Sequence, residues 1–318
     1  MATYGFHASH EQFPPGELLT LLQAAEAAGF EAGMCSDHFA PWSSRQGHSG
    51  YAWTWLGSAL ATTSLPMGVV TSPGHRYHPA ILAQAAATCA EMFPGRFWLA
   101  LGTGQALNEH VTGDAWPVKQ VRDERLAESV AVIRALFAGE TVSHDGLVKV
   151  DRATLWTLPE RQPPLYGAAV TPATAGRVAR WADGLITINQ PGDAQRDVLA
   201  AYREAGGQGP AVLQVHLSWA ADLAQARQAA HDQWREPVLG SDVDWELALP
   251  EYFEQVSRFI DVDQVTPFVF TSDQLAEHTE WLAAQVAAGF DQLMLHQVGA
   301  DQRGFLTAFG NEVLPQLP

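Results

Sequence analysis

Residues 97–109 read FWLALGTGQALNE, in which five apolar residues run directly into a cluster of glycine and polar residues. An apolar run such as Phe97 to Gly102 predicts a buried strand, and the longer segment that follows has the apolar spacing of a helix. The stretch therefore indicates a β-strand followed by an α-helix, with Gly102 and Gly104 in the turn between them.

The same strand-then-helix pattern recurs along the chain of 318 residues. Eight runs predict strands: Thr3 to Ala8, Ala32 to Ser36, Pro66 to Thr71, Phe97 to Gly102, Leu165 to Ala169, Gly184 to Thr187, Val212 to Trp219 and Gln292 to His296. No proline-rich linker or block of charge divides them, which favours a closed (β/α)8 TIM barrel over a doubly wound open sheet. We therefore predict an α/β protein with a single domain over residues 1–318, with insertions near residues 140–163 and 233–265.

The composition argues against several classes of function. Hydrophobic residues make up 47% of the chain and charged residues 17%, which is typical of a protein that buries a large core. The formal net charge is −17 and the only lysines are Lys119 and Lys149, so no cationic tract is available for nucleic acid or a membrane surface. No apolar run approaches the roughly 20 residues that cross a bilayer. Because the two cysteines cannot build a disulfide framework and no secretory leader is visible, we expect a cytoplasmic protein.

Polar clusters follow the second, third and fourth predicted strands. They read SDHFAPW at 36–42, SPGHRYH at 72–78 and GTGQALNE at 102–109. In a barrel the carboxyl ends of the strands meet at one mouth, where active sites are built, so we expect these clusters to converge. Gly102 and Gly104 would allow the backbone to approach a planar or anionic ligand, and Thr103 and Asn108 can hydrogen-bond the edge of a heterocycle.

Several of these residues also have ordinary structural explanations. His38 could be a buried histidine satisfied by the preceding aspartate or a carbonyl, although its place at a barrel mouth favours a functional role. Trp53 and Trp55 are expected to pack in the core, and Cys35 to be an inert core thiol. Glu109 is expected to place negative charge in the first turn of the helix that follows, or to cap it.

Histidines lie at the ends of several predicted strands, which raises the alternative of a metal site. They are His7, His38, His75, His78 and His296. No HExxH or similar spacing of two histidines and a carboxylate is present, so we predict no metal.

Taken together, the motifs resemble a known family. SDHFAPW at 36–42, RYHP at 76–79, PGR at 94–96 with GTGQALNE at 102–109, and GADQRGFL at 299–306 are similar to motifs of the luciferase-like flavin or deazaflavin oxidoreductases. The nearest resemblance is to the deazaflavin-dependent glucose-6-phosphate dehydrogenases, and it runs in order over nearly the whole chain. It implies a barrel that is commonly a homodimer, with a flavin-type ring at the mouth and a small-molecule substrate.

The resemblance also implies roles for individual residues. It places Asp37 in cofactor binding, His38 in proton transfer and Trp42 beside the reacting carbon. Substrate contacts are expected from His75, Ile188 and Asn189. A non-proline cis peptide behind the ring would fall at Val69–Val70. Further cofactor contacts are expected from Val69, Val70, Gly102, Thr103, Gly104, Asn108, Ala168, Ala169, Val170 and Thr171.

The chain departs from that family at positions that bear on the reaction. Gln105 stands where the dehydrogenases have a proton-donating glutamate, and because an amide cannot exchange a proton at neutral pH, we expect it to hold the substrate or ring instead. Pro191 and Pro267 stand where cations hold the sugar phosphate, which predicts a substrate without phosphate. Val170 and Thr171 replace a pair of glycines on the phosphate side of the cofactor, and the chain resembles a subgroup that uses an ordinary flavin. We therefore favour FMN over the 8-hydroxy-5-deazaflavin coenzyme.

These observations predict a flavin- or deazaflavin-dependent oxidoreductase that transfers a hydride between the ring and an uncharged or weakly polar substrate. Three alternatives stay open. The first is a monooxygenase that uses oxygen and reduced flavin supplied by a flavin reductase. The second is a flavin-binding protein without turnover, and the third is a metal-dependent barrel hydrolase.

Overall fold

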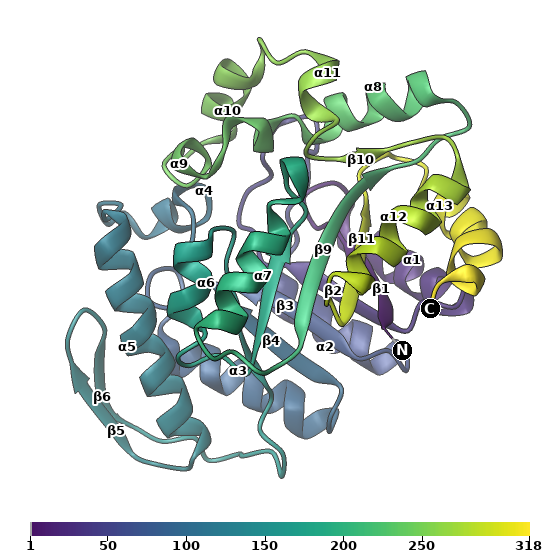
Figure 1. The fold of residues 1–318 in the computed structure, drawn as a ribbon. Coiled ribbons are helices and arrows are strands. Elements are labelled where there is room, and N and C mark those ends of the chain that lie inside the picture. The colour runs from purple at the N-terminus through teal and green to yellow at the C-terminus, as the bar shows by residue number, and fades with distance from the viewer. Residues whose placement is uncertain (1) are drawn as a thin grey trace.

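A computed structural model describes residues 2–318 and shows a closed barrel of eight parallel strands (Figure 1). Neighbouring strands pair in the order β1-β2-β3-β4-β7-β8-β9-β11, and β11 pairs with β1 to close the ring. The predicted (β/α)8 barrel is therefore confirmed. The strands span Thr3–Ala8 (β1), Ala32–Ser36 (β2), Met67–Thr71 (β3), Phe97–Leu101 (β4), Leu165–Ala168 (β7), Gly184–Ile188 (β8), Ala211–Ser218 (β9) and Gln292–Gln297 (β11). A two-residue strand, β10 (Phe270–Thr271), pairs in parallel with the end of β9 at Leu217 and Ser218.

Helices surround the barrel, and their starts follow local sequence signals. Pro15, Pro79 and Pro172 each occupy the first turn of a helix, where proline's missing N–H costs nothing. Gly29 follows the first helix with a positive φ of 95°, as expected of a helix stop. The main helices are α1 (Pro15–Ala27), α2 (Ala52–Thr62), α3 (Pro79–Met92), α5 (Lys119–Phe137), α6 (Pro172–Val178), α7 (Gln195–Glu204), α8 (Leu223–Trp234), α12 (Leu275–Ala287) and α13 (Gln302–Ala308).

Glycines on the strands make room for large side chains inside the barrel. A methyl group on Gly68 would lie 2.0 Å from Trp98 Cζ2, and one on Gly5 would lie 2.2 Å from Met294 Sδ. Trp98 and Met294 belong to one buried apolar cluster that also contains Met34 and Ile186. The barrel interior is thus filled by side chains, as a closed eight-stranded barrel requires.

Both predicted insertions carry secondary structure of their own. Residues 140–163 form an antiparallel hairpin of β5 (Val142–Asp145) and β6 (Lys149–Ala153), which lies against α5. Residues 233–265 form short helices beside α8, at the top of Figure 1: α9 (Ser241–Asp244), α10 (Pro250–Ser257) and α11 (Val262–Val265). The second insertion reaches the cluster after β4, because the backbone N–H of Ala106 donates to the carbonyl of Trp245 at 3.0 Å.

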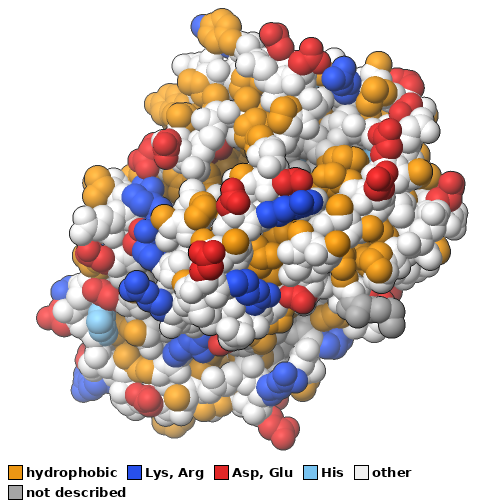
Figure 2. Space-filling model, viewed as in Figure 1, with side chains coloured by type: hydrophobic (Ala, Val, Ile, Leu, Met, Phe, Trp, Pro, Cys, Tyr) orange, Lys and Arg blue, Asp and Glu red, His pale blue; other side chains and the backbone are white. Residues whose placement is uncertain are grey.

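The tryptophans and cysteines expected in the core are buried. Trp53 and Trp55 lie on α2 within the main hydrophobic cluster, so their predicted packing role is confirmed. Burial raises the pKa of the Cys35 thiol well above its ordinary value, which keeps it protonated and unreactive. Among residues 2–318, no helix combines the length and apolar character needed to cross a bilayer. On the face shown in Figure 2, basic and acidic side chains are interspersed.

Candidate active site

The carboxyl ends of the barrel strands form an opening, which we call the mouth. Residues within the strands are buried, whereas those at the ends, such as Ser36, Val70, Ala168 and Ile188, are partly exposed. The glycine cluster after β4, residues 102–105, is also partly exposed at this level. The predicted clusters therefore share one end of the barrel, as expected from its topology.

Asp37 is buried at the start of the loop that follows β2, and β3 and its loop hold it. Its carboxylate accepts hydrogen bonds from Thr71 Oγ1 at 2.9 Å and from the Tyr77 hydroxyl at 3.1 Å, and Arg76 Nη2 lies 3.5 Å away. Burial and the adjacent Asp37 carboxylate raise the pKa of the Tyr77 phenol, so it remains a donor. These contacts join the loop after β2 to the loop after β3, and they engage both oxygens of the Asp37 carboxylate.

His38 is paired with Glu11, which the sequence did not suggest. His38 Nδ1 lies 3.4 Å from Glu11 Oε1, and the buried Glu11 also accepts a hydrogen bond from Ser9 Oγ at 3.0 Å. The preceding aspartate does not satisfy His38, because the Asp37 carboxylate accepts hydrogen bonds from Thr71 and Tyr77 of β3 and its loop. Glu11 lies just beyond β1, and the neighbouring positions of β1 and β2 in the barrel bring it to the histidine.

Trp42 packs beside His38, with ring centroids 5.4 Å apart. Its other side meets Phe253 of α10 edge to face, at 5.2 Å and an interplanar angle of 90°. The second insertion thus holds the predicted catalytic tryptophan against the predicted catalytic histidine.

The loop after β4 is shaped by Gly104 and fastened by Asn108. Gly104 has a φ of 78°, and a methyl group there would lie 2.8 Å from Ser72 Oγ. Asn108 Oδ1 accepts a hydrogen bond from the Phe39 N–H at 2.8 Å, and Asn108 Nδ2 donates to Gln105 Oε1 at 3.3 Å. The amide of Asn108 therefore joins the loops after β2 and β4, while Gly102 and Thr103 remain partly exposed.

Glu109 places a carboxyl group in the first turn of the helix after the β4 loop, as predicted, and it also has a contact that was not predicted. It ends the four-residue helix α4 (Ala106–Glu109) and is buried, where its Oε2 accepts a hydrogen bond from the Arg76 N–H at 2.8 Å. Burial raises the pKa of its carboxyl group. Glu109 therefore also links the loops after β3 and β4.

The expected cis peptide at Val69–Val70 is absent, because every peptide bond in residues 2–318 is trans. Both residues sit in regular parallel register, with Val69 opposite Cys35 and Leu99 and Val70 opposite Ser36 and Ala100. A non-proline cis bond costs about 2.5–4 kcal/mol, and this uninterrupted ladder keeps the ordinary trans strand.

Beside the loop after β4, the segment from Ala168 to Thr171 leads from β7 into α6. Ala168 and Val170 are partly exposed, and Ala169 is buried. Thr171 Oγ1 accepts a hydrogen bond from the Thr174 N–H at 3.3 Å, so this hydroxyl caps α6.

The three predicted substrate residues do not share one environment. Ile188 is partly exposed at the end of β8. Asn189 is buried, and its side chain bonds the backbone of His216 and the Phe268 carbonyl, which makes it a structural bracket. His75 Nδ1 lies 2.6 Å from Arg125 Nη1, and burial followed by this cation lowers the pKa of His75 to about 4.

Three further histidines lie inside the barrel at this end. The His296 ring centroid is 4.5 Å from that of His7 and 5.4 Å from that of His216, and Trp234 packs 4.5 Å from His296. Burial lowers the pKa of His216 to about 3, and burial with the neighbouring histidines lowers those of His7 and His296 well below the usual range. No group of histidine, cysteine and carboxylate side chains in residues 2–318 is arranged to hold a metal. The sequence places His7 and His296 at strand ends, whereas it does not single out His216, which lies within β9.

A recess of about 400 Å³ opens next to the end of β8. Its wall includes Gln190, Thr266 and the stacked rings of Phe270 and Trp281, whose centroids are 4.9 Å apart. The only charged residue in its lining is Asp193, which pairs with Arg196 at 3.2 Å. We call this feature the rim recess.

Comparison with known proteins identifies a family and several relatives that match nearly the whole chain. Residues 2–302 match the family described as luciferase-like monooxygenase. The chain is 35% identical to an F420-dependent glucose-6-phosphate dehydrogenase of Nakamurella multipartita, covering 99% of this chain and 96% of that protein. It is 32% identical to a protein of the same description from Mycobacterium tuberculosis, covering 98% of this chain and 97% of that protein. Among solved structures, an F420-dependent secondary alcohol dehydrogenase in complex with an F420-acetone adduct superposes with a TM-score of 0.92 at 27% identity, over 100% of this chain and 99% of that one.

Proposed function

The chain belongs to the luciferase-like monooxygenase family, and from that premise we propose that it is an oxidoreductase that transfers a hydride between a deazaflavin coenzyme and an uncharged substrate. The observation that carries the proposal is the His38–Glu11 pair beside Trp42 at the mouth of the barrel. The F420-dependent relatives favour the deazaflavin as the cofactor. The sequence favours FMN instead, and binding of FMN stays an untested prediction.

The mouth fits a flat ring with polar edges. Gly102 leaves the backbone after β4 uncovered, since a methyl group there would meet only Ala168 Cβ at 3.6 Å. Ser72 Oγ and Thr187 Oγ1 are buried hydroxyls without a hydrogen-bond partner in the described chain, and both follow or end barrel strands. Val70, Gly102, Thr103 and Ala168 would hold the ring, with these hydroxyls available to its edge. A bound deazaflavin supplies a carbon that donates or accepts hydride.

His38 is the residue that we assign to proton transfer. Histidine is the side chain whose ordinary pKa lies nearest neutrality, and a carboxylate at Nδ1 stabilises the imidazolium formed when Nε2 takes a proton. Glu11 Oε1 lies 3.4 Å from Nδ1, within ion-pair range of an imidazolium but without hydrogen-bond geometry, and no hydrogen bond engages His38 Nε2 within residues 2–318. His38 Nε2 would therefore exchange a proton with a substrate hydroxyl or carbonyl oxygen. Gln105, an amide, would hold the substrate without exchanging protons.

The rim recess supports a substrate without phosphate. A bound phosphate dianion needs charge-assisted partners, and the only charged side chain in this lining is the carboxylate of Asp193. Because Asn189 is engaged with the backbone, the Gln190 amide, the Thr266 hydroxyl and the Phe270–Trp281 pair remain to contact a ligand there. This environment suits a neutral polar group better than a dianion.

Titration of the purified apo protein with F420 and with FMN tests the proposal. We expect F420 to bind well below about 100 μM, which corresponds to about −5.5 kcal/mol, and binding of neither cofactor below that limit would refute the proposal. Turnover of alcohols or carbonyl compounds should then proceed without oxygen. Strict dependence on oxygen and on a flavin reductase would instead identify a monooxygenase, and a bound cofactor with no substrate-dependent spectral change would identify a binding protein.

We further propose that the protein is a homodimer, as the resemblance implies. Ile81 and Met92 on α3 are both more than half exposed, and their spacing of eleven residues, about three helical turns, places them on one face of the helix. Light scattering coupled to size exclusion should give a mass of about two chains, whereas a monomer at micromolar concentration would contradict the proposal.

A further inference from the structure

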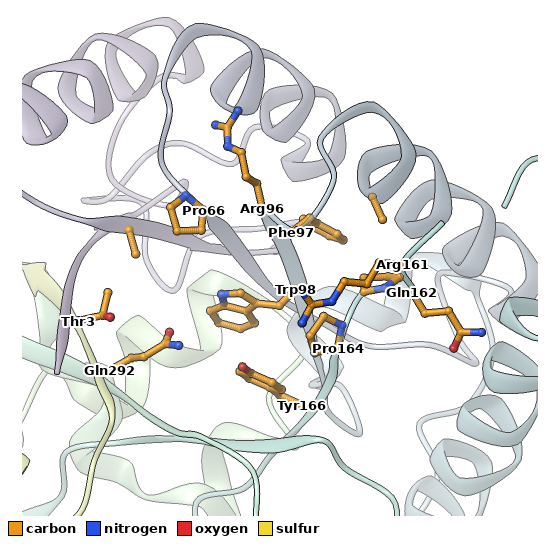
Figure 3. Close-up of a pocket in the computed structure, with 14 residues that line it drawn as sticks. Thr3, Pro66, Arg96, Phe97, Trp98, Arg161, Gln162, Pro164, Tyr166 and Gln292 are labelled. Carbon is orange, nitrogen blue, oxygen red and sulfur yellow. The ribbon is translucent and has the colours of Figure 1, made fainter. Parts of the chain in front are cut away.

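A second cavity lies at the opposite end of the barrel from the mouth, where the strands begin. It has a volume of about 210 Å³, and we call it the basal cavity. Its polar and aromatic lining includes Thr3, Trp98, Arg161, Tyr166 and Gln292, from β1, β4, β7, β11 and the loop before β7 (Figure 3). The volume equals about seven waters at roughly 30 Å³ each, enough for one small ring. No step of the proposed reaction uses this end of the barrel.

One wall of the basal cavity is a preformed aromatic pair. Trp98 and Tyr166 stack with ring centroids 5.0 Å apart and an interplanar angle of 22°. Gly68 and Gly184 leave the space that the rings occupy, since a methyl group on Gly184 would lie 2.8 Å from Tyr166 Cδ1. In Figure 3 the two rings lie between Gln292 on one side and Arg161 with Pro164 on the other. Rigid rings bind a planar ligand without losing side-chain freedom.

The cavity offers hydrogen-bond donors that the described chain does not use. Burial raises the pKa of Tyr166 to about 12, so its phenol stays protonated. Neither the Tyr166 hydroxyl nor Trp98 Nε1 has a hydrogen-bond partner within residues 2–318. The amide of Gln292 and the hydroxyl of Thr3 add to this set. A ligand there would be held best through acceptor atoms.

The charged side chains in the lining of the basal cavity are basic, although the chain carries −17 overall. Its lining includes Arg96 and Arg161 and no carboxylate. Arg96 donates to the carbonyls of Thr63 and Leu65, whereas Arg161 forms no ion pair in the described part of the chain.

Two carboxylates act electrostatically on the Tyr166 phenol, and both have partners outside the cavity. Asp183 pairs with Arg134 at 2.9 Å, and Asp291 accepts a hydrogen bond from the Ala211 N–H at 2.7 Å. An anion in the cavity would therefore meet an arginine that has no competing carboxylate.

We propose that the basal cavity is a second ligand site that binds a small aromatic carboxylate, with one ring against the Trp98–Tyr166 pair and the carboxylate facing Arg161. The ring accounts for the aromatic wall and the proline and phenylalanine side chains around it. The carboxylate accounts for the free guanidinium and the unused donors, because arginine binds carboxylates through two parallel hydrogen bonds.

Isothermal titration of the full-length apo protein with benzoate tests this site without relying on the proposed reaction. We expect a dissociation constant of about 1 mM or tighter, which is reasonable for a ligand with so few atoms. Benzyl alcohol, which lacks the charge, and acetate, which lacks the ring, should each bind at least about tenfold more weakly.

Two variants locate the binding. Arg161→Gln should weaken benzoate at least about tenfold, and Tyr166→Phe should weaken it a few-fold by removing one donor. Arg180→Gln serves as the matched control, because Arg180 is also an exposed arginine but does not line the cavity. Loss of benzoate binding in Arg161→Gln with unchanged binding of F420 or FMN would support a separate site.

Three results would overturn the proposal. The first is that benzoate does not bind below about 20 mM. The second is that the wild type and Arg161→Gln bind benzoate with equal affinity. The third is that the cofactor displaces benzoate, which would place the benzoate at the mouth. A failure of F420 and FMN to bind would overturn the proposed function and leave the basal site unaffected.

Discussion

At the scale of single residues, the partner of His38 is decided by which nearby carboxylate is not already engaged by other hydrogen-bond donors. Asp37 and Glu11 are both buried carboxylates near His38. The oxygens of Asp37 are taken by Thr71 and Tyr77, so only Glu11 is available to the imidazole. Sequence adjacency pointed to the wrong partner, because the pairing depends on hydrogen bonds from β3 that no local pattern reports.

The replacement His38→Asn tests the proton-transfer role. General acid–base catalysis contributes roughly 100- to 10,000-fold, so kcat should fall by about that range while cofactor affinity remains nearly unchanged. Steady-state kinetics with one substrate, together with a cofactor titration of the same variant, measure both quantities. Retention of more than about a third of wild-type turnover would remove His38 from the mechanism. Gln105→Ala provides the comparison, since it should raise KM more than it lowers kcat.

At the scale of elements, the barrel strands carry the clearest local signal. Each of the eight predicted runs coincides with an observed strand to within about two residues, because a strand buried on both faces is apolar along its length. The β5–β6 hairpin was predicted only as an insertion. Its residues alternate in exposure, and it is tied down by Glu128, which accepts hydrogen bonds from the Val148 N–H at 3.0 Å and from His144. Such a contact between distant segments leaves no trace in local sequence.

Replacing Gly68 by alanine should destabilise the barrel. The added methyl group would lie 2.0 Å from Trp98 Cζ2, and overpacking a core typically costs about 1–3 kcal/mol. The free energy of unfolding from urea titration should fall by about that amount or more. Gly57→Ala on α2 is the matched control, because nothing lies within 4 Å of the new methyl group and alanine favours a helix by about 1 kcal/mol. Equal effects of the two substitutions would contradict the packing argument.

The second insertion should make stability depend on pH. Burial, followed by the nearby Glu236 carboxylate, raises the pKa of Asp244 from 3.8 to about 8. The native state therefore holds a proton that the unfolded chain releases, so this residue's contribution to stability is lost as the pH rises from about 4 to about 8. Asp244→Asn removes the ionisation. Urea titrations at about pH 5 and about pH 9 should show the wild type losing stability relative to the variant, and parallel behaviour would be the contrary result.

At the scale of the whole molecule, the barrel separates two ends of different character. The polar loops, the buried histidines and the second insertion lie at the mouth. The Trp98–Tyr166 pair and two arginines lie at the base. The location of the mouth could be predicted from sequence, because the topology of a parallel barrel fixes where the loops meet. The basal cavity could not be predicted from sequence. Its aromatic wall depends on the space that Gly68 leaves for Trp98 and Gly184 leaves for Tyr166, and these contacts exist only in the closed barrel.

Charge over the whole molecule bears on the substrate. The net charge of −17 disfavours the approach of anions, and the rim recess places one carboxylate and no cation in its lining. Glucose 6-phosphate, the sugar in the description of several relatives, carries a dianion that would meet no cation in the lining of the rim recess.

Glucose 6-phosphate is therefore expected to be a poor ligand and substrate. Each charge-assisted hydrogen bond is worth about 1.5–3 kcal/mol, so the loss of two such contacts weakens recognition roughly 100- to 10,000-fold. Initial rates with F420 should show no saturation at micromolar glucose 6-phosphate. Pro267→Lys supplies the matched gain-of-charge variant, because residue 267 lines the recess and is exposed, and it should strengthen binding of the phosphate but not of glucose. Saturable micromolar turnover by the wild type would show that the phosphate finds a cationic partner elsewhere, and the assignment of an uncharged substrate would be withdrawn.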